Sequence, residues 1–258
     1  MSDEGIFTKE REQLILKLLN EKGRISVSEL EKHFGISGST ARRHLNDLQK
    51  NGMLIRTYGG AISNGDLFLE ESVENKSVQR IIEKKEIAMA ARKFINDGDI
   101  IMLGGGTTIL ELAKLLNNLK DSIVITDSIL TAVELYKNSN IEVQIVGGII
   151  RSISGVTVGP SALKQLETAY VDKAFIGADS ISIEFGITTP NPFEAEIERI
   201  LIKQAKSVFV LADNTKFQKT TLSKQASLNE IDYIITNSKS DKNYLKEIKS
   251  FGIQVVQT

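Results

Sequence analysis

Two helical patterns joined by a glycine near the N-terminus constrain the fold of this chain most strongly. Apolar residues recur at helical spacing in both segments: Val27, Leu30 and Phe34 in the first, and Ala41, Leu45 and Leu48 in the second. Gly35 suits the turn between them, and Ser26 and Ser37 are suited to cap the two helices. An earlier apolar pattern ends before Gly23. The spacing predicts three helices with a helix-turn-helix among them.

The face of the third helix that points away from its apolar residues is polar and basic. Hydroxyl, amide and guanidinium groups near the start of such a helix can reach guanine edges and phosphates in the major groove. We therefore predict binding of a double-stranded DNA operator through these side chains: Ser37, Ser39, Thr40, Arg42, Arg43 and, on the next segment, Arg56. The alternative for Arg42 and Arg43 is an ordinary solvated helix face.

A short hairpin is expected directly after this helix. Asn51-Gly52 is a turn signal, and the segment from Met53 to Tyr58 leads into Gly59-Gly60. Such a hairpin would be the wing of a winged helix-turn-helix, in which Arg56 and Tyr58 can meet the DNA backbone. For Tyr58 we favour the alternative, which is packing of the hairpin onto the helices.

Charge is distributed unevenly along the chain. Residues 37–58 contain four basic residues and one acid, a local net charge of +3 in a chain whose net charge is −1. A local basic patch on a nearly neutral protein favours site-selective binding over indiscriminate coating of DNA.

Composition excludes several classes of protein and site. The sequence contains no cysteine, which excludes disulfides, thiolate metal sites and thiol nucleophiles. Its first residues include acids and no apolar signal region, and no stretch approaches the roughly 20 apolar residues that span a bilayer. We expect a cytoplasmic protein with no membrane partner, no metal and no cofactor.

The remainder of the chain has a different pattern. Residues 64–76 are polar and acidic, which predicts a linker. From Ser77 onward, helical patterns, the first expected over residues 77–96, alternate with short, continuously apolar strands. This alternation predicts an α/β domain whose mostly parallel sheet is covered on both faces. The expected organisation is a winged helix-turn-helix domain at 1–63, a linker at 64–76 and a Rossmann-like α/β domain at 77–258.

Polar segments follow several of the predicted strands, where ligands bind in sheets of this kind. The first is Gly104-Gly-Gly-Thr-Thr, whose glycines, threonine hydroxyls and helix N-terminus would form a phosphate cradle. The alternative is a tight turn that needs glycine anyway. Across the strand ends, the predicted ligand residues are Gly105, Gly106, Thr107, Thr108, Gly148, Arg151, Asp179 and Lys216. Asp127 and Ser128 also follow a strand, but we favour helix capping for both.

These segments resemble the DeoR family of bacterial transcription regulators. Residues 8–62 are similar to its DNA-binding domain through Thr40-Ala-Arg-Arg-His-Leu and Arg56-Thr-Tyr-Gly-Gly-Ala. Residues 75–256 are similar to its sensor domain through the following motifs: Gly106-Thr-Thr, Gly147-Gly with Arg151, Asp172-Lys-Ala-Phe-Ile-Gly, Gly186-Ile-Thr-Thr-Pro-Asn with Glu194-Ala, and Leu211-Ala-Asp-Asn-Thr-Lys-Phe. Three departures are visible: His44 stands where the family usually has Asp, Gly104 replaces an acidic residue, and Ser180 replaces a glycine.

The resemblance implies a fold and a function. The sensor domain of the family is similar in fold to ribose-5-phosphate isomerase and glucosamine-6-phosphate deaminase, and it typically senses phosphorylated sugars or polyols. The resemblance therefore implies that the chain is a repressor of carbohydrate-metabolism genes, controlled by such an effector. The alternative is an isomerase or deaminase with a DNA-binding appendage, in which Asp179 or Glu194 would act as base and Lys216 as electrophile. We expect no enzyme, because Ser180-Ile-Ser-Ile stands where the isomerases carry several closely spaced acids.

A homo-oligomer, dimer or higher, is also expected. One recognition helix reads only a few base pairs, so selection of a genomic site requires two or more linked half-sites. The C-terminal domain is the expected dimeriser, because the small N-terminal unit has little apolar surface left after packing its own core.

Overall fold

A computed structural model of the chain describes residues 11–19, 24–50, 53–57, 59–63 and 71–258. It divides into two compact units, Met1–Leu69 and Glu70–Thr258, each with its own core. The boundary falls inside the segment expected as a linker, 64–76. No helix in the described part of the chain is long and apolar enough to cross a membrane.

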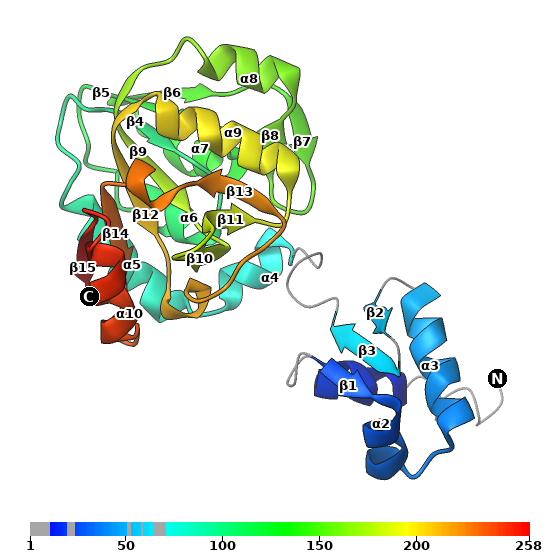
Figure 1. Ribbon diagram of the computed structural model, residues 1–258. Helices are drawn as coiled ribbons and strands as arrows, with labels where there is room; N and C mark the ends of the chain where they lie inside the picture. Colours follow the sequence, from blue (N-terminus) through cyan, green and yellow to red (C-terminus); the bar gives the residue numbers. More distant parts are fainter. Residues whose placement is uncertain (1–10, 20–23, 51–52, 58, 64–70) are drawn as a thin grey trace. The chain divides into compact units, whose positions relative to one another are not determined.

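The first unit is a helix-turn-helix with a small antiparallel sheet (Figure 1). A helix over residues 11–19 comes first, and the elements that follow are β1 (Arg24–Ser26), α2 (Val27–Phe34), α3 (Gly38–Lys50), β2 (Leu54–Thr57) and β3 (Gly60–Ser63). The strands lie in the order β1-β3-β2, so β2 and β3 form the hairpin expected as the wing.

The caps predicted for α2 are present. Ser26 Oγ accepts the Glu29 N–H at 3.2 Å, and the Glu29 carboxylate accepts the Ser26 N–H at 2.8 Å. This capping box satisfies donors that the first turn of a helix leaves open. Gly35 ends the helix in the left-handed region, with φ 63°. A single local sequence pattern therefore determines both ends of α2.

His44 belongs to the core of the first unit. Its side chain is fully buried on α3 beside Leu45 and Leu48, and its Nδ1 lies 3.5 Å from Glu12 Oε1 on the first helix. The departure from the family pattern at His44 is therefore a side chain packed in the core of this unit.

The second unit is built on a seven-stranded sheet whose paired strands are all parallel. Its strands, in spatial order, are β15 (Gln254–Gln257), β14 (Tyr233–Thr236), β12 (Ala205–Leu211), β9 (Val171–Gly177), β4 (Ile100–Leu103), β5 (Ser122–Thr126) and β6 (Ile141–Ile145). Two smaller antiparallel sheets are added: β7 (Ile149–Arg151) with β8 (Val156–Val158), and β10 (Ser180–Ser182) with β11 (Gly186–Thr189) and β13 (Ser223–Ala226).

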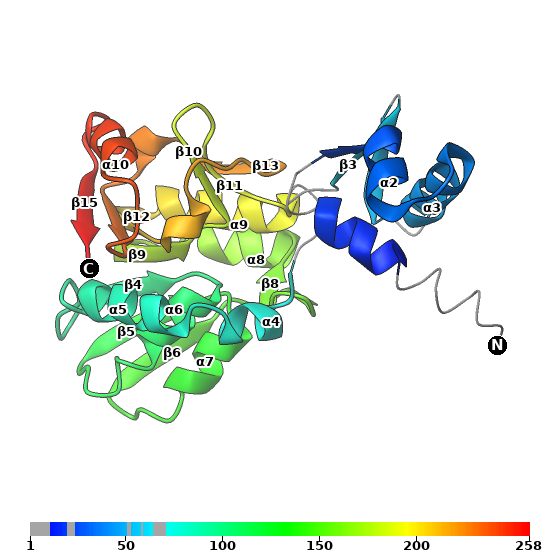
Figure 2. The same cartoon turned by 90° about the horizontal axis from the view of Figure 1, so that it is seen from below.

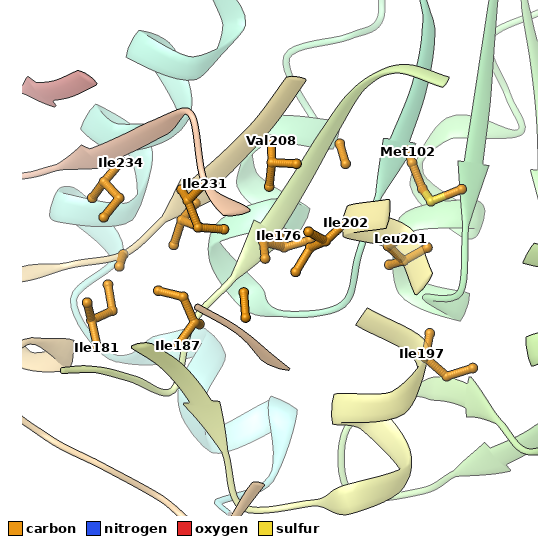
Figure 3. Close-up of a cluster of buried hydrophobic side chains, with 14 of the residues drawn as sticks. Met102, Ile176, Ile181, Ile187, Ile197, Leu201, Ile202, Val208, Ile231 and Ile234 are labelled. Atoms are coloured by element: carbon orange, nitrogen blue, oxygen red, sulfur yellow. The ribbon is translucent and has the colours of Figure 1, made fainter. Parts of the chain in front are cut away.

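Helices cover both faces of the large sheet, as Figure 2 shows. One face is covered by α5 (Ile81–Arg92), α6 (Thr107–Ala113) and α7 (Ile129–Leu135), and the other by α8 (Pro160–Leu166), α9 (Pro192–Lys203) and α10 (Lys242–Lys249). Alternate residues of each strand enter the two cores, since successive side chains point to opposite faces. On β12, Phe209 packs with α5 and α6, while Val208 and Val210 pack on the other side. Figure 3 shows Val208 within that second cluster.

One helix assignment from the sequence was wrong. A single helix was expected over residues 77–96, but the structure has α4 (Val73–Val78) and α5, separated by Gln79 and Arg80. Ser72 caps α4, and Arg80 adopts φ 50°, which breaks the helical path between them. The segment called a linker therefore ends in a helix that belongs to the second unit.

Candidate functional site

Most of the predicted DNA-binding residues of the first unit lie on the outward face of α3, with Ser37 directly before the helix and Arg56 on β2. Ser37, Ser39, Arg42 and Arg43 are exposed, while Ala41, Leu45 and Leu48 are buried. Ser37 Oγ lies 2.9 Å from the hydroxyls of both Ser39 and Thr40 and accepts the Thr40 N–H at 3.3 Å. The hydroxyls and guanidinium groups are thus gathered at the N-terminal end of one helix.

Arg56 has a structural contact of its own. Its Nη1 donates to the Gly60 carbonyl at 2.7 Å across the β2–β3 hairpin. A guanidinium carries five N–H donors, so this bond braces the hairpin and leaves donors for a phosphate. Tyr58 lies outside the described residues.

A cavity of about 130 Å³ lies in the second unit, at the carboxyl ends of β4, β5, β9 and β12. Six of the eight predicted ligand residues line it: Gly105, Gly106, Thr107, Thr108, Asp179 and Lys216. The other two do not. Gly148 lies in the connection between the edge strand β6 and β7, where an added Cβ would come within 2.7 Å of the Val158 carbonyl oxygen. Arg151 lies behind the wall and pairs with Glu194, which lines the cavity.

The turn after β4 needs its glycines for two separate reasons. Gly106 caps α6 with φ 111°, a conformation that other residues rarely adopt. A Cβ on Gly105 would lie 2.4 Å from Val156 Cγ1, which packing forbids. Because α6 has only seven residues, the hydroxyls of Thr107 and Thr108 matter more to an anion here than the helix dipole.

Four cationic side chains surround this turn, and three of them were not identified from the sequence. Lys76, Arg80 and Lys84 come from α4, the break and α5, and Lys216 comes from the turn after β12. The sequence signal for these three is a basic residue at every fourth position from 76 to 84, and the linker expected over residues 64–76 conceals its start. Burial lowers the pKa of Lys84, and the charges of Lys216 and Lys76 lower it further, against the opposing effect of Asp213.

Asp179 and Asp213 neutralise two of these cations. Lys76 Nζ lies 2.7 Å from Asp179 Oδ1, and Arg80 Nε lies 3.9 Å from Asp213 Oδ1. Thr189 Oγ1 donates to Asp179 Oδ2 at 2.9 Å. Burial by itself raises the pKa of Asp179, but the charges of Lys76 and Lys216 and these hydrogen bonds outweigh it and lower the pKa below its ordinary value. Asp179 is therefore ionised.

A group of buried acids forms another part of the wall. It consists of Asp127 after β5 and of Glu194 and Glu198 on α9. Burial and the charge of Glu194 raise the pKa of Asp127 to about 7. Burial, followed by the charges of Asp127 and Glu194, raises the pKa of Glu198 well above its ordinary range. Gln225 Nε2 donates to the Glu198 carboxyl.

The capping role expected for Asp127 was wrong, whereas that of Ser128 is confirmed. Ser128 Oγ accepts the Thr131 N–H at 3.3 Å and caps α7. Asp127 is 3% exposed and lines the cavity, and within the described part of the chain its Oδ1 has no hydrogen-bond partner. A carboxyl oxygen left in this state costs free energy, so its position calls for a functional explanation.

The raised pKa of Asp127 predicts a pH-dependent stability. Between its ordinary pKa of 3.8 and about 7, the folded protein binds a proton at Asp127 that the unfolded chain releases. The free energy of unfolding therefore falls as pH rises through this window, and Asp127→Asn removes this loss. In denaturant titrations, the wild type should become less stable relative to Asp127→Asn as pH rises from about 4 to about 8. The exposed Glu247→Gln serves as control, and parallel profiles for wild type and Asp127→Asn would contradict the prediction.

Comparison with known proteins relates both units of the chain to one family. Residues 11–66 match the DeoR-like helix-turn-helix domain, and residues 79–238 match the DeoR C terminal sensor domain. The second unit has a likeness to ribose 5-phosphate isomerase A from Methanocaldococcus jannaschii, with 24% identity over 52% of this chain and 53% of that one and a TM-score of 0.38.

Curated relatives extend over nearly the whole chain. It is 33% identical to the HTH-type transcriptional regulator GlpR of Haloferax volcanii over 96% of both chains. It is 34% identical to the HTH-type transcriptional repressor GlcR of Bacillus subtilis, over 98% of this chain and 97% of the relative. These relatives are named regulators and repressors, which confirms the expectation of a regulator and not an enzyme. The chain belongs to the DeoR family of DNA-binding transcriptional regulators.

Proposed function

We propose that this regulator represses carbohydrate-metabolism genes and that a phosphorylated sugar or polyol, bound in the cavity of the second unit, controls it. One observation carries the proposal. Among the described residues, Lys84 and Lys216 line the cavity beside Thr107 and Thr108 without a salt-bridge partner, whereas Lys76 and Arg80 are paired.

A phosphate fits these groups by charge and by hydrogen bonding. Lys84 is 5% exposed, and its Nζ donates to the Lys76 carbonyl. A buried ammonium near two other lysines gains most from an incoming anion, since the anion offsets both desolvation and repulsion. The hydroxyls of Thr107 and Thr108, 8% and 9% exposed as residues, supply neutral donors to the same region.

The ligand's hydroxyl groups would be read by the ionised acids of the wall. Asp179 accepts only two hydrogen bonds in the described contacts, from Lys76 and Thr189, and a carboxylate has acceptor sites for more. Asp213 and Thr215 follow the next strand and line the same cavity. A small anionic compound with several hydroxyls uses both sets of groups, which supports a sugar or polyol phosphate.

Helix α4 gives a route by which the effector changes DNA binding. It begins at Val73, close in sequence to the boundary between the units, and its Lys76 pairs with Asp179 inside the cavity. A ligand that competes for Lys76 or Asp179 shifts the position of this helix, and we propose that the shift releases DNA. The size of the effect is limited by the difference in ligand affinity between the two arrangements.

Two copies of the chain would hold the paired half-sites. Exposed apolar side chains gather on neighbouring elements of the second unit: Val133 and Tyr136 at α7, Ile145 on β6, and Ile149 and Ile150 on β7. The Ile129 N–H donates to the Gly155 carbonyl at 3.0 Å, which ties α7 to the β7–β8 hairpin. A surface of this kind suits a self-complementary dimer interface.

The DNA-binding assignment is tested by substitution of Arg43. Arg43→Ala should weaken binding to an operator, selected with the purified protein, by about 1–3 kcal/mol, because a bidentate contact to guanine is lost. Fluorescence anisotropy measures the affinity. Lys17→Ala, which removes an exposed cation from the first helix, is the matched control. Unchanged affinity in both Arg42→Ala and Arg43→Ala proteins would refute the assignment.

The phosphate assignment is tested by calorimetry on a ligand found by thermal-shift screening of sugar and polyol phosphates. Lys216→Gln should reduce affinity for the phosphorylated compound by about tenfold to a hundredfold, as expected for a lost charge-assisted hydrogen bond. Thr107→Ala should reduce it less. Lys239→Gln, outside the cavity, is the control. Equal affinity of the wild type for phosphorylated and unphosphorylated forms would exclude the phosphate site.

The dimer surface is tested in the full-length protein by sedimentation velocity. The wild type should sediment as a dimer or larger species at micromolar concentration, and Ile149→Asp should shift it toward monomer, because a charge would be buried unpaired. Ile82→Asp, at an equally exposed position on α5, controls for a general loss of solubility. A wild type that is monomeric both free and on its operator would overturn this part of the proposal.

A further inference from the structure

Some of the charged side chains that line the cavity form salt bridges, and others do not. Lys76 pairs with Asp179, Arg80 with Asp213, and Glu194 with Arg151 from behind the wall. Within the described part of the chain, the charged lining groups left without a salt bridge are the cations Lys84 and Lys216, the two buried acids Asp127 and Glu198, and the exposed Glu71, which accepts a hydrogen bond from Gln79. The two cations serve the phosphate proposed above. The two acids have no role in that proposal.

Both acids are deeply buried and close to one another. Asp127 is 3% exposed and Glu198 is 9% exposed, and burial raises the pKa of both. The charge of Glu194 also raises the pKa of Asp127, and the charges of Asp127, Glu194 and Asp179 also raise the pKa of Glu198. Arg151 pairs with Glu194, and the charge of Lys76 lowers the pKa of Glu198 against the larger effects of burial and the neighbouring acids. The acids therefore retain their protons because the protein supplies too little positive charge beside them.

Unsatisfied acceptors mark the same part of the cavity. Among the described residues, Asp127 Oδ1 and Gln225 Oε1 are buried without a hydrogen-bond partner, and both residues line the cavity. Gln225 is held in place by its bond to Glu198 and is 3% exposed. Buried acceptors at a cavity wall require donors from whatever occupies the cavity.

An ammonium group meets both requirements. It carries three N–H donors for the acceptors and a positive charge for the carboxyls. A hydroxyl supplies one donor and no charge, and a second anionic group would raise the pKa of these carboxyls further instead of lowering it. Since the phosphate has already been assigned to the lysine side of the cavity, the amine must belong to the same molecule.

We propose that the effector carries a protonated amino group in addition to its phosphate, and that Asp127 and Glu198 select this amino compound over the corresponding hydroxyl compound. The inference rests on the proposed function, because it concerns the same cavity. It narrows the ligand class from sugar and polyol phosphates to amino sugar or amino polyol phosphates.

The inference is tested in the full-length protein with pairs of ligands. The two members of each pair differ only in carrying an amino group or a hydroxyl group at one position. Calorimetry would compare the 6-phosphates of glucosamine, galactosamine and mannosamine with those of glucose, galactose and mannose, and with N-acetylglucosamine 6-phosphate, whose nitrogen is uncharged. At least one amino compound should bind tenfold or more tightly than its hydroxyl partner. Acetylation should abolish the gain if charge is responsible.

Substitution of Asp127 and Glu198 tests whether these two acids cause the preference for the amino compound. Asp127→Asn and Glu198→Gln should each reduce the preference for the amine at least severalfold and keep binding of the hydroxyl phosphate. Glu247→Gln, on the exposed face of α10, should leave the preference unchanged. Calorimetry at pH 6 in two buffers of different ionisation enthalpy should detect more proton release on amine binding to the wild type than to Asp127→Asn, because Asp127 ionises beside the ammonium.

The outcomes separate this inference from the proposed function. If every amino phosphate binds no tighter than its hydroxyl partner, amine selection is overturned while the phosphate site stands. A preference that persists in both Asp127→Asn and Glu198→Gln overturns the assignment to these acids. If phosphorylated and unphosphorylated sugars bind equally, the proposed function itself fails.

Discussion

Burial of the parallel sheet on both faces is the constraint on which the second unit depends. A parallel strand needs a crossover to reach its neighbour, so each strand ends in a loop at the same edge of the sheet. Here β4, β5, β9 and β12 all end at the cavity. Hydrophobic side chains fill both faces, and the polar residues of the unit are concentrated where the strands stop. The site is thus a consequence of how the core is built.

Neighbouring charge decides the state of each acid in that site. Asp127 and Asp179 both follow buried strands and line one cavity. Asp179 meets Lys76 and Lys216 and has a lowered pKa, whereas Asp127 meets Glu194 and has a pKa raised to about 7. Burial opposes ionisation in both cases, so the difference comes from the neighbours. One cavity therefore presents ionised acceptors on one part of its wall and proton-holding carboxyls on another.

The break between α4 and α5 has a similar importance for the cations. Arg80, with φ 50°, ends the path of α4, so that residues on both sides of the break reach the cavity. The same segment follows the boundary between the two units. Three cations that line the cavity and the connection to the first unit consequently lie on one short stretch of chain.

Local chemistry was sufficient for part of this protein, and tertiary structure decided the rest. The helix-turn-helix followed from Ser26, Gly35 and apolar spacing, because caps, a left-handed glycine and periodicity act over a few residues. Asp179 and Lys216, selected because they follow predicted strands, line the cavity. Gly148, selected for the same reason, does not line it, since β6 lies at the edge of the sheet, away from the central strands that form the cavity.

The environments of Lys84, Asp127 and Glu198 are visible only in the folded structure. Each depends on burial and on charges from distant segments, as when Lys76 meets Asp179 across 103 residues of sequence. No local pattern encodes such neighbours. The sequence by itself determined which elements form and where most polar loops lie, and only the tertiary structure decided which of those polar groups are paired, buried or left to meet a ligand.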